Sequence, residues 1–261
     1  MKRQLLDVIF TSEKRKNTLL SLKDGPKEIN FLLKSLDTTR HSLLPQIRVL
    51  EDSHLVDHKN DIYKLTTIGK LIVERMIPLL NSVETFETDI DYWGTHNLNF
   101  IPPYLLKRLE ELQKCEVIRP SHVHIYDLNE TVMKSSFESE FMCGLCTFYH
   151  PHFPKFFSGL MEKDADVYFV TTPEVLNKLR KECIADFEEL LKNKLFHFYV
   201  CSAKMDFLAV VYNNYHLLMR PLTIDGEVDT QYVLCFSPEA LKWANDLFEH
   251  YLSQSKSVTE I

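Results

Sequence analysis

The spacing of apolar residues near the start of the chain predicts a helix over residues 39–53. Its apolar positions recur at i, i+4 and i+7, which is the pattern of a helix with one buried face. Pro45 lies inside this helix and removes one main-chain hydrogen bond, so the helix either kinks there or begins its regular part only near Ser42. The apolar face consists of Leu43, Ile47 and Leu50.

A tight β-hairpin is predicted directly after this helix. Its strands are residues 55–58 and 62–65, and the turn between them is Lys-Asn-Asp at residues 59–61. A hydroxyl at Thr66 or Thr67 can then cap a further helix. A polar-faced helix followed by a hairpin is typical of a winged helix-turn-helix, whose helix enters the major groove of DNA.

Two shorter helices precede this motif, at residues 12–22 and 27–36, and Asp-Gly-Pro at 24–26 separates them. Lys14, Arg15 and Lys16 lie in the first turn of the first helix, where positive charge is unfavourable beside the helix dipole. These residues are either phosphate contacts or an ordinary solvated charge run.

The outward face of the recognition helix and the hairpin tip carry the candidate DNA contacts. Arginine pairs with guanine and glutamine with adenine, while threonine and serine also bind phosphates. Histidine, lysine and asparagine at the hairpin tip are candidates for backbone contact. The candidates are Thr38, Thr39, Arg40, His41, Ser42, Gln46, Arg48, His58, Lys59 and Asn60.

A long apolar helix is predicted over residues 68–92, bent or split at Pro78. It is too apolar for an isolated linker, so we expect it to pack on its equivalent in a second chain. The alternative is packing on its own domain. The predicted dimerisation residues are Leu71, Ile72, Met76, Leu79, Val83 and Phe86.

After a linker that ends in paired prolines, strands alternate with helices, which predicts an α/β domain. The predicted fold class is thus an α+β winged helix-turn-helix, a helical linker and an α/β sensor-like domain. The three domains are expected at residues 1–67, 68–103 and 104–261, and the tail after residue 252 is expected to fray.

The distribution of charge agrees with DNA binding by the first domain alone. The net charge of the 261 residues is −7, but residues 1–80 carry 14 Lys and Arg against 10 Asp and Glu, a balance of +4. The remaining residues carry −11. Neutralising phosphates needs a local positive surface and not a basic whole protein.

The six cysteines are expected to be reduced and mostly buried, since no export signal or membrane-spanning run is visible and a cytoplasmic location is expected. One cluster suggests other chemistry, because Cys-x-x-Cys with nearby histidines can hold zinc or cycle between dithiol and disulfide. On an extended strand the two sulfurs would point to opposite faces unless Gly144 forms a bulge. The cluster consists of Cys143, Cys146, His150 and His152.

Two further sets of residues are candidate binding sites. His122 and His124 alternate along a predicted strand and could share a metal, although no carboxylate or cysteine spacing supports one. Six aromatic residues could line an apolar effector pocket or fill a core. They are Phe196, Phe198, Tyr199, Phe207, Tyr212 and Tyr215.

The blocks WGTHNLNFIPPYLLKRLEEL, FMCGLCTFYHPHF and EALKWANDLFEHY, in this order after the winged helix, resemble transcriptional regulators of methanogenic archaea. These join an ArsR/MarR-like winged helix to a methanogenesis-regulatory C-terminal domain. The closing helix also looks like the end of the effector domain in TrmB-type archaeal regulators. The resemblance implies a homodimeric regulator and establishes no ligand residues.

The chain is therefore predicted to be a homodimeric regulator that binds double-stranded promoter DNA. Its C-terminal domain would sense a small-molecule effector or dock a sensor protein, and no cofactor, metal or membrane is expected. The alternatives are a thiol- or metal-responsive switch at Cys143 and Cys146, or a winged helix that binds protein. An enzyme is not expected, because the chain lacks the common phosphate-loop, hydrolase and metalloprotease motifs and the His-x-Lys of phospholipase D chemistry.

Overall fold

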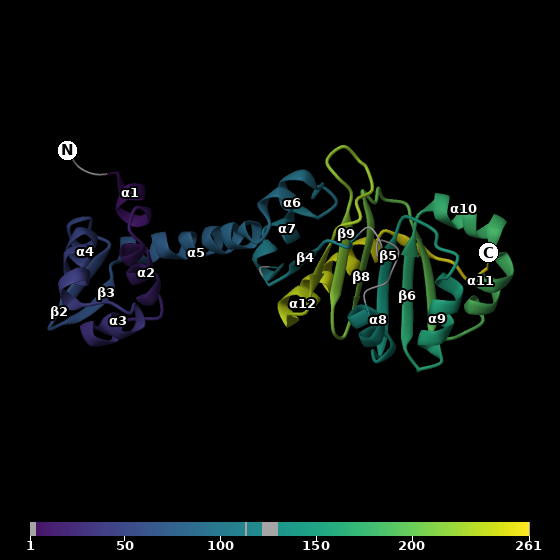
Figure 1. Ribbon diagram of the computed structural model, residues 1–261, viewed down its shortest axis with the longest axis horizontal. Coiled ribbons are helices and arrows are strands. Elements are labelled where there is room, and N and C mark those ends of the chain that lie inside the picture. The colour runs from purple at the N-terminus through teal and green to yellow at the C-terminus, as the bar shows by residue number, and fades with distance from the viewer. Residues whose placement is uncertain (1–3, 113, 122–129, 261) are drawn as a thin grey trace. The chain divides into compact units, whose positions relative to one another are not determined.

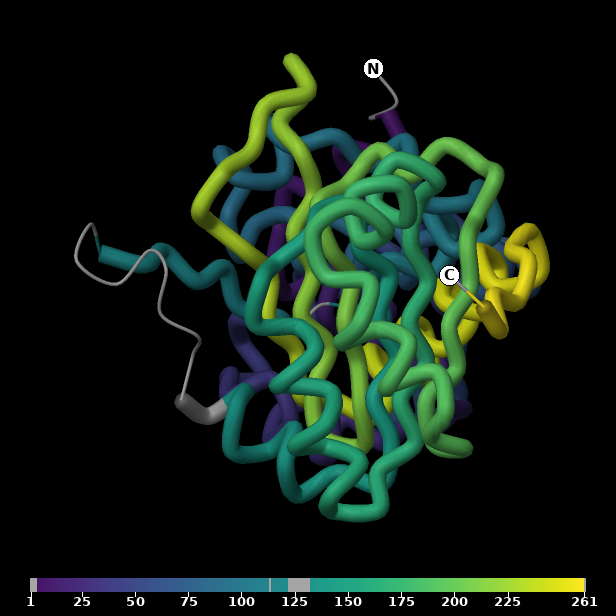
Figure 2. Tube along the Cα trace, turned by 90° about the vertical axis from the view of Figure 1, so that its right-hand side faces the viewer, coloured from purple at the N-terminus to yellow at the C-terminus, as the bar shows by residue number. Residues whose placement is uncertain are grey.

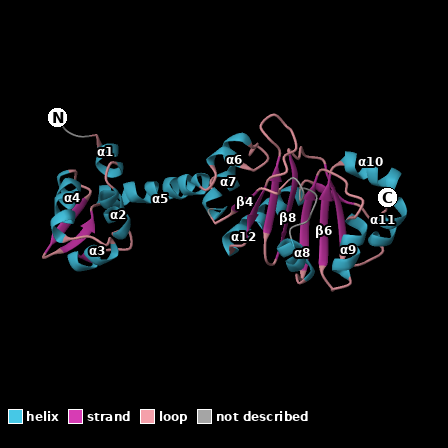
Figure 3. Ribbon diagram, in the orientation of Figure 1, coloured by secondary structure: helices cyan, strands magenta, loops and turns pink. Residues whose placement is uncertain are grey.

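The computed structural model describes residues 4–112, 114–121 and 130–260, and the chain forms two compact units, Met1–Asn81 and Ser82–Ile261. Each unit has its own sheet (magenta in Figure 3) and its own core. Among the described residues, no helix is both long and apolar enough to cross a bilayer.

Four helices of the N-terminal unit precede its hairpin. The N-cap hydroxyls of Ser12 and Thr39 accept hydrogen bonds from the main chain of the second and fourth helices, as expected of these residues. The recognition helix α4 continues through Pro45. The helices are α1 (Leu5–Phe10), α2 (Glu13–Ser21), α3 (Ile29–Ser35) and α4 (Arg40–Asp52).

The predicted hairpin is present as β2 (Val56–Lys59) and β3 (Ile62–Leu65), and β1 (Lys27–Glu28) pairs with β3 to give the order β1-β3-β2. Asn60 and Asp61 both have positive φ, 52° and 60°, as a two-residue type I′ turn requires. The unit is therefore a winged helix, as predicted, and β1 adds a third short strand to its sheet.

One apolar core joins these elements. Leu43, Ile47 and Leu50 of α4 are buried in it together with Leu55 and Leu65 of the hairpin. The start of α5 (Thr67–Glu87) lies very close to the hairpin, because a Cβ at Gly69 would be 2.1 Å from the main-chain oxygen of Leu55. Only glycine permits this approach.

The predicted helix over residues 68–92 is divided into α5 and α6 (Ile90–Thr95). The second half of the predicted linker, which ends at residue 103, is part of the C-terminal unit and not a free connection. Tyr92, Trp93, Phe100 and Ile101 are buried in the core of the C-terminal unit. Their burial explains why this segment is rich in aromatic and apolar residues.

In the described residues, the C-terminal unit is built on a mixed eight-stranded sheet of order β11-β7-β6-β5-β8-β9-β10-β4. The strands β5, β6 and β7 are parallel and their connections are helical, whereas the other pairs are antiparallel. The strands are β4 (Glu116–Ile118), β5 (Phe141–Cys146), β6 (Asp166–Thr171), β7 (Phe196–Cys201), β8 (Phe207–Asn213), β9 (Leu217–Pro221), β10 (Tyr232–Cys235) and β11 (Ser255–Ser257).

Helices cover both faces of this sheet. The long helix α12 packs on one face through Trp243, Leu247 and Phe248, while α9 and α11 pack on the other through Phe157 and Phe187. The loop between β9 and β10 extends beyond the sheet in both views (Figures 1 and 2). The helical elements are α7 (Pro103–Leu106), η1 (Leu109–Leu112), α8 (Glu130–Phe137), α9 (Phe153–Met161), α10 (Pro173–Glu182), α11 (Ile184–Leu191) and α12 (Pro238–Leu252).

Two sequence expectations about this unit are wrong. The tail after α12 does not simply fray, because β11 pairs with β7. The cysteines are not all reduced, because Cys115, the residue before β4, forms a disulfide with Cys235, the last residue of the neighbouring strand β10. Local patterns do not reveal a pair that lies 120 residues apart in the sequence.

Candidate nucleic-acid interface

The recognition helix α4 has one buried and one exposed face. Leu43, Ile47 and Leu50 point into the core, and the polar residues lie on the other side. Of the predicted contacts in and just before this helix, Thr39, Arg40, His41 and Arg48 are exposed, and Thr38, Ser42 and Gln46 are half-buried. The structure therefore exposes four of these seven side chains, and their contact with DNA stays a prediction.

The wing presents its predicted contacts to solvent and is joined to α4 by one ion pair and one histidine–carboxylate contact. His58, Lys59 and Asn60 are all exposed. Arg40 of α4 lies 2.7 Å from the carboxylate of Asp61 at the turn, and this carboxylate raises the pKa of Arg40. His58 Nδ1 pairs with Glu51, near the end of α4. The hairpin thus contacts the recognition helix near both ends of that helix, through Arg40 and through Glu51.

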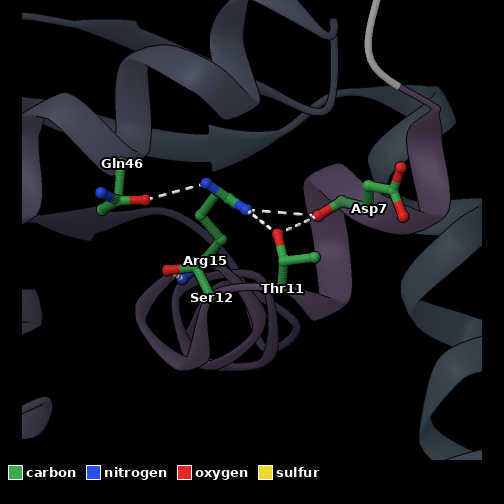
Figure 4. A pocket seen from close by; sticks show the side chains of 5 residues that line it. All are labelled: Asp7, Thr11, Ser12, Arg15 and Gln46. Carbon is green, nitrogen blue, oxygen red and sulfur yellow. Dashed lines mark hydrogen bonds between the residues drawn. The ribbon is translucent and has the colours of Figure 1, made fainter.

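The basic residues in the first turn of α2 bind other side chains of the N-terminal unit. The sequence predicted phosphate contacts or solvated charges instead. Arg15 is only 6% exposed, so it is neither a solvated charge nor a free phosphate contact. Its Nη1 donates to Gln46 Oε1 at 3.0 Å, and Lys14 Nζ donates to Ser42 Oγ (Figure 4 shows the Arg15 contact). Lys16 pairs with Glu13 at 2.8 Å. In the sequence, this role is indicated only by the position of three positive charges at the N-terminal end of a helix, where the helix dipole disfavours them.

A polar pocket lies beside Arg15, lined by residues of α1, α2 and α4 (Figure 4). Arg15 Nε donates to the main-chain oxygen of Val8, and Nη2 donates to the main-chain oxygen of Asp7 at 3.2 Å and to Thr11 Oγ1 at 2.5 Å. These carbonyls belong to α1, so Arg15 ties the end of α1 to α2; the oxygen of Asp7 also accepts from the main-chain N–H of Thr11.

The predicted dimerisation residues of α5 divide into two groups. Leu71, Leu79 and Val83 are exposed by 60%, 55% and 41%, respectively. The other three pack within the chain itself. Ile72 and Met76 lie in or against the N-terminal core, and Phe86 lies against the C-terminal core.

The structure separates the sulfurs of the Cys-x-x-Cys segment. Strand β5 pairs without a shift on both sides of Gly144, so there is no bulge. Cys143 therefore faces the α12 side and Cys146 the α9 side. Burial raises the pKa of both thiols to about 12, which disfavours the reactive thiolate.

The other candidate sets do not form a site in the described residues. His150 accepts a hydrogen bond from the main chain of His152, and no group of three metal-binding side chains is found in the described part of the chain. Phe196 and Phe198 lie in one core cluster and Phe207 and Tyr212 in the other, so the aromatic residues line no common pocket. His122 and His124 lie outside the described residues.

Two family models and one relative are similar to this chain. The N-terminal domain model of the methanogenesis regulatory protein FilR1 matches residues 3–84, and the middle domain model matches residues 125–254. The methanogenesis regulatory protein FilR1 of Methanothrix harundinacea strain 6Ac is 25% identical over 260 residues. That match covers 97% of this chain, and the chain spans 58% of the relative's length.

Two solved structures have a more distant likeness. The archaeal chromatin protein TrmBL2 aligns over 94% of both chains with 10% identity and a TM-score of 0.44. A phospholipase D family member, Nuc from Salmonella typhimurium, aligns over 49% of this chain and 88% of its own, with 11% identity and a TM-score of 0.36. Both scores are too low to establish a shared fold.

The N-terminal domain model matches the winged-helix unit, and the middle domain model matches most of the C-terminal unit. Together the two models cover most of the chain. A regulatory protein family also agrees with the expectation that the chain is not an enzyme. The chain belongs to the FilR1 family of methanogenesis regulatory proteins.

Proposed function

We propose that this protein is a transcriptional regulator that binds duplex DNA through α4 and the β2–β3 wing. The observation that carries this proposal is the polar, exposed face of α4 directly beside an exposed hairpin tip. A helix of this kind fits the major groove, and the hairpin reaches the neighbouring backbone. The name of the FilR1 relative supports a regulatory role, and we extend control of methanogenesis genes to this chain as part of the proposal.

The charge distribution supports the same surface. The first 80 residues carry +4 and the rest −11, so the N-terminal unit is attracted to phosphates and the C-terminal unit is repelled. The acidic unit would then act by receiving a signal, from a small molecule or a sensor protein. A signal can change DNA binding only if it favours one arrangement of the dimer over another.

The proposed regulator acts as a homodimer that pairs through α5. Ile68, Leu71, Leu79 and Val83 are large, exposed and apolar, and their spacing places them within one stripe of the helix. Two copies joined along this stripe would carry two recognition helices, which a near-palindromic site accepts at about 34 Å apart.

The test is the binding of the full chain to duplex DNA from its own promoter regions, followed by fluorescence anisotropy at several salt concentrations. A regulator that neutralises phosphates loses affinity steeply as salt rises, because counterions are released on binding. Arg40→Ala and Gln46→Ala should each weaken binding by about tenfold, the cost of one lost base contact.

The matched control is Lys23→Ala. Lys23 is an exposed cation after the far end of α2, roughly 13 Å along this helix from Lys14. Its removal should change the affinity by less than about threefold, the size of one exposed charge interaction. Equal losses in all three variants would contradict α4 as the contacting face, whereas a salt-independent affinity would support a winged helix that binds protein.

A further inference from the structure

Gln46 is held by a neighbour that can only donate hydrogen bonds. A guanidinium has five N–H groups and no acceptor, so the Gln46 atom that faces Arg15 Nη1 is the amide oxygen. The amide nitrogen lies on the side away from Arg15 in Figure 4, and it has no hydrogen-bond partner among the described residues. One orientation of the amide is therefore selected.

Arg15 is itself held in place, so its direction does not depend on Gln46. Three of its N–H contacts go to Val8, Asp7 and Thr11 at the end of α1, and the side chain is almost completely buried. The guanidinium is planar and rigid, so anchoring Nε and Nη2 also fixes the direction of Nη1. The fourth contact, from Nη1 to Gln46, therefore fixes a side chain of the recognition helix relative to α1.

The residue before Arg15 repeats this arrangement one turn earlier on α4. Lys14 donates to Ser42 Oγ, and an ammonium group has no acceptor either. Ser42 and Gln46 are four residues apart and therefore neighbours on one face of the helix. In both cases the oxygen is occupied from inside the domain and the hydrogen is left for an outside partner.

We infer that Arg15 is a positioning residue, which orients Gln46 so that it meets DNA as a hydrogen-bond donor. This inference rests on the proposed DNA binding. Reading adenine with both atoms of the amide needs the oxygen to accept and the nitrogen to donate. Arg15 engages one lone pair of this oxygen and turns the oxygen towards α2, which leaves the nitrogen as the outer atom of the amide. Gln46 then recognises an acceptor of the duplex, either a base edge such as guanine O6 or N7, or a phosphate oxygen.

Gln46→Glu gives the sharpest test, because it keeps an oxygen for Arg15 but replaces the outward amide by a second carboxylate oxygen. The full-length variant should stay folded and bind a promoter duplex at least about tenfold more weakly, since an acceptor would then face an acceptor. The matched control is Gln4→Glu, which adds the same charge at the exposed N-cap residue of α1. The inference is overturned if both variants bind equally well.

A double-mutant cycle separates positioning from a purely structural role of Arg15. If Arg15 acts through Gln46, adding Gln46→Ala to the Arg15→Lys variant should cost less than about twofold, although it costs about tenfold in the wild type. Independent, multiplying losses would show that Arg15 only stabilises α1 and would overturn the inference. Thermal unfolding of each variant confirms that the protein measured is folded.

Selection from a duplex library with a random core identifies the acceptor. Loss of preference at one base position in Gln46→Ala indicates a base edge, whereas an equal loss on all sequences indicates a phosphate, and each result supports a donor role. If the wild type binds no duplex at low salt, the proposed function itself fails. If the wild type binds but Gln46→Glu matches Gln4→Glu, only the orientation of Gln46 is wrong.

Discussion

Several side chains proposed to face DNA are already held in place by other residues of the N-terminal unit. The pairs are Arg40 with Asp61, Ser42 with Lys14, Gln46 with Arg15 and His58 with Glu51. Holding a side chain before binding reduces the entropy lost on association, which is about 0.5–1.5 kcal/mol for a mobile side chain. The pair with Asp61 has a cost as well, because a carboxylate competes with phosphate for Arg40.

Asp61→Asn should therefore strengthen DNA binding by about threefold, the size of one exposed charge interaction. Asn tolerates the positive φ of 60° at this position, so the turn should keep its shape. The control is Asp57→Asn, which removes the same charge from a pair with Lys64 on the same hairpin. Anisotropy titrations that gave the same gain for both variants would assign it to net charge and not to release of Arg40.

We expect His216 to make the stability of the C-terminal unit sensitive to acid. It is completely buried beside Ser135, and burial lowers its pKa to about 4 from the ordinary value near 6.5. The unfolded chain therefore takes up a proton between pH 6.5 and 4 that the folded chain does not, so stability falls as the pH falls through this range.

Between pH 7 and pH 5 this histidine should cost about 2 kcal/mol of unfolding free energy. Urea unfolding followed by tryptophan fluorescence reports on this unit, because both tryptophans, Trp93 and Trp243, lie in its core. In His216→Gln the difference between the two pH values should shrink by that amount. An unchanged difference would mean that His216 already carries its proton when folded.

At the scale of the element, α5 serves three surfaces with different residues. Met76 faces the winged-helix core, Phe86 packs on Trp93 of the C-terminal unit, and Leu71 and Leu79 remain exposed. A helix that is apolar on more than one side normally packs against more than one partner. The exposed side is therefore where a second copy of the chain is expected.

The double variant Leu71→Gln and Leu79→Gln should shift the protein from dimer to monomer and weaken DNA binding by more than tenfold, since one recognition helix would bind alone. Lys70→Gln is the matched control, because Lys70 is exposed on the opposite side of the same helix. Light scattering coupled to size-exclusion chromatography gives the masses. A double variant that keeps the wild-type mass would place the dimer interface elsewhere.

At the scale of the whole molecule, the disulfide between Cys115 and Cys235 closes a loop that includes most of the C-terminal unit. It joins the edge strand β4, which follows α6, α7 and η1, to the strand that leads into α12. A cross-link over so many residues restricts the unfolded chain strongly.

Reduction should lower the unfolding free energy of this unit by about 4 kcal/mol, the value expected for a loop of this length. Under denaturing conditions without reductant, alkylation should modify four thiols, those of Cys143, Cys146, Cys183 and Cys201. Mass spectrometry counts them, and Cys183→Ser provides a control that leaves the cross-link intact. Six modified cysteines would mean that the pair is reduced in solution.

The sequence by itself determined most of the helices, the hairpin and most of the alternating strands, because these depend on the spacing of apolar residues and on local turn chemistry. It also placed Arg40, His41 and Arg48 on the outer face of α4, since Leu43, Ile47 and Leu50 leave that face free. Each of these conclusions uses residues that are close together in the chain.

The tertiary structure alone decided which distant residues meet. Arg15 and Gln46 are 31 residues apart, and Cys115 and Cys235 are 120 apart, so neither pairing leaves a periodic signal in the sequence. Likewise, the fold alone shows that the basic first turn of α2 binds α1 and α4. It also shows that the aromatic segment after α5 lies in the C-terminal core. Periodicity shows which side of an element is buried, and only the fold shows what that side is buried against.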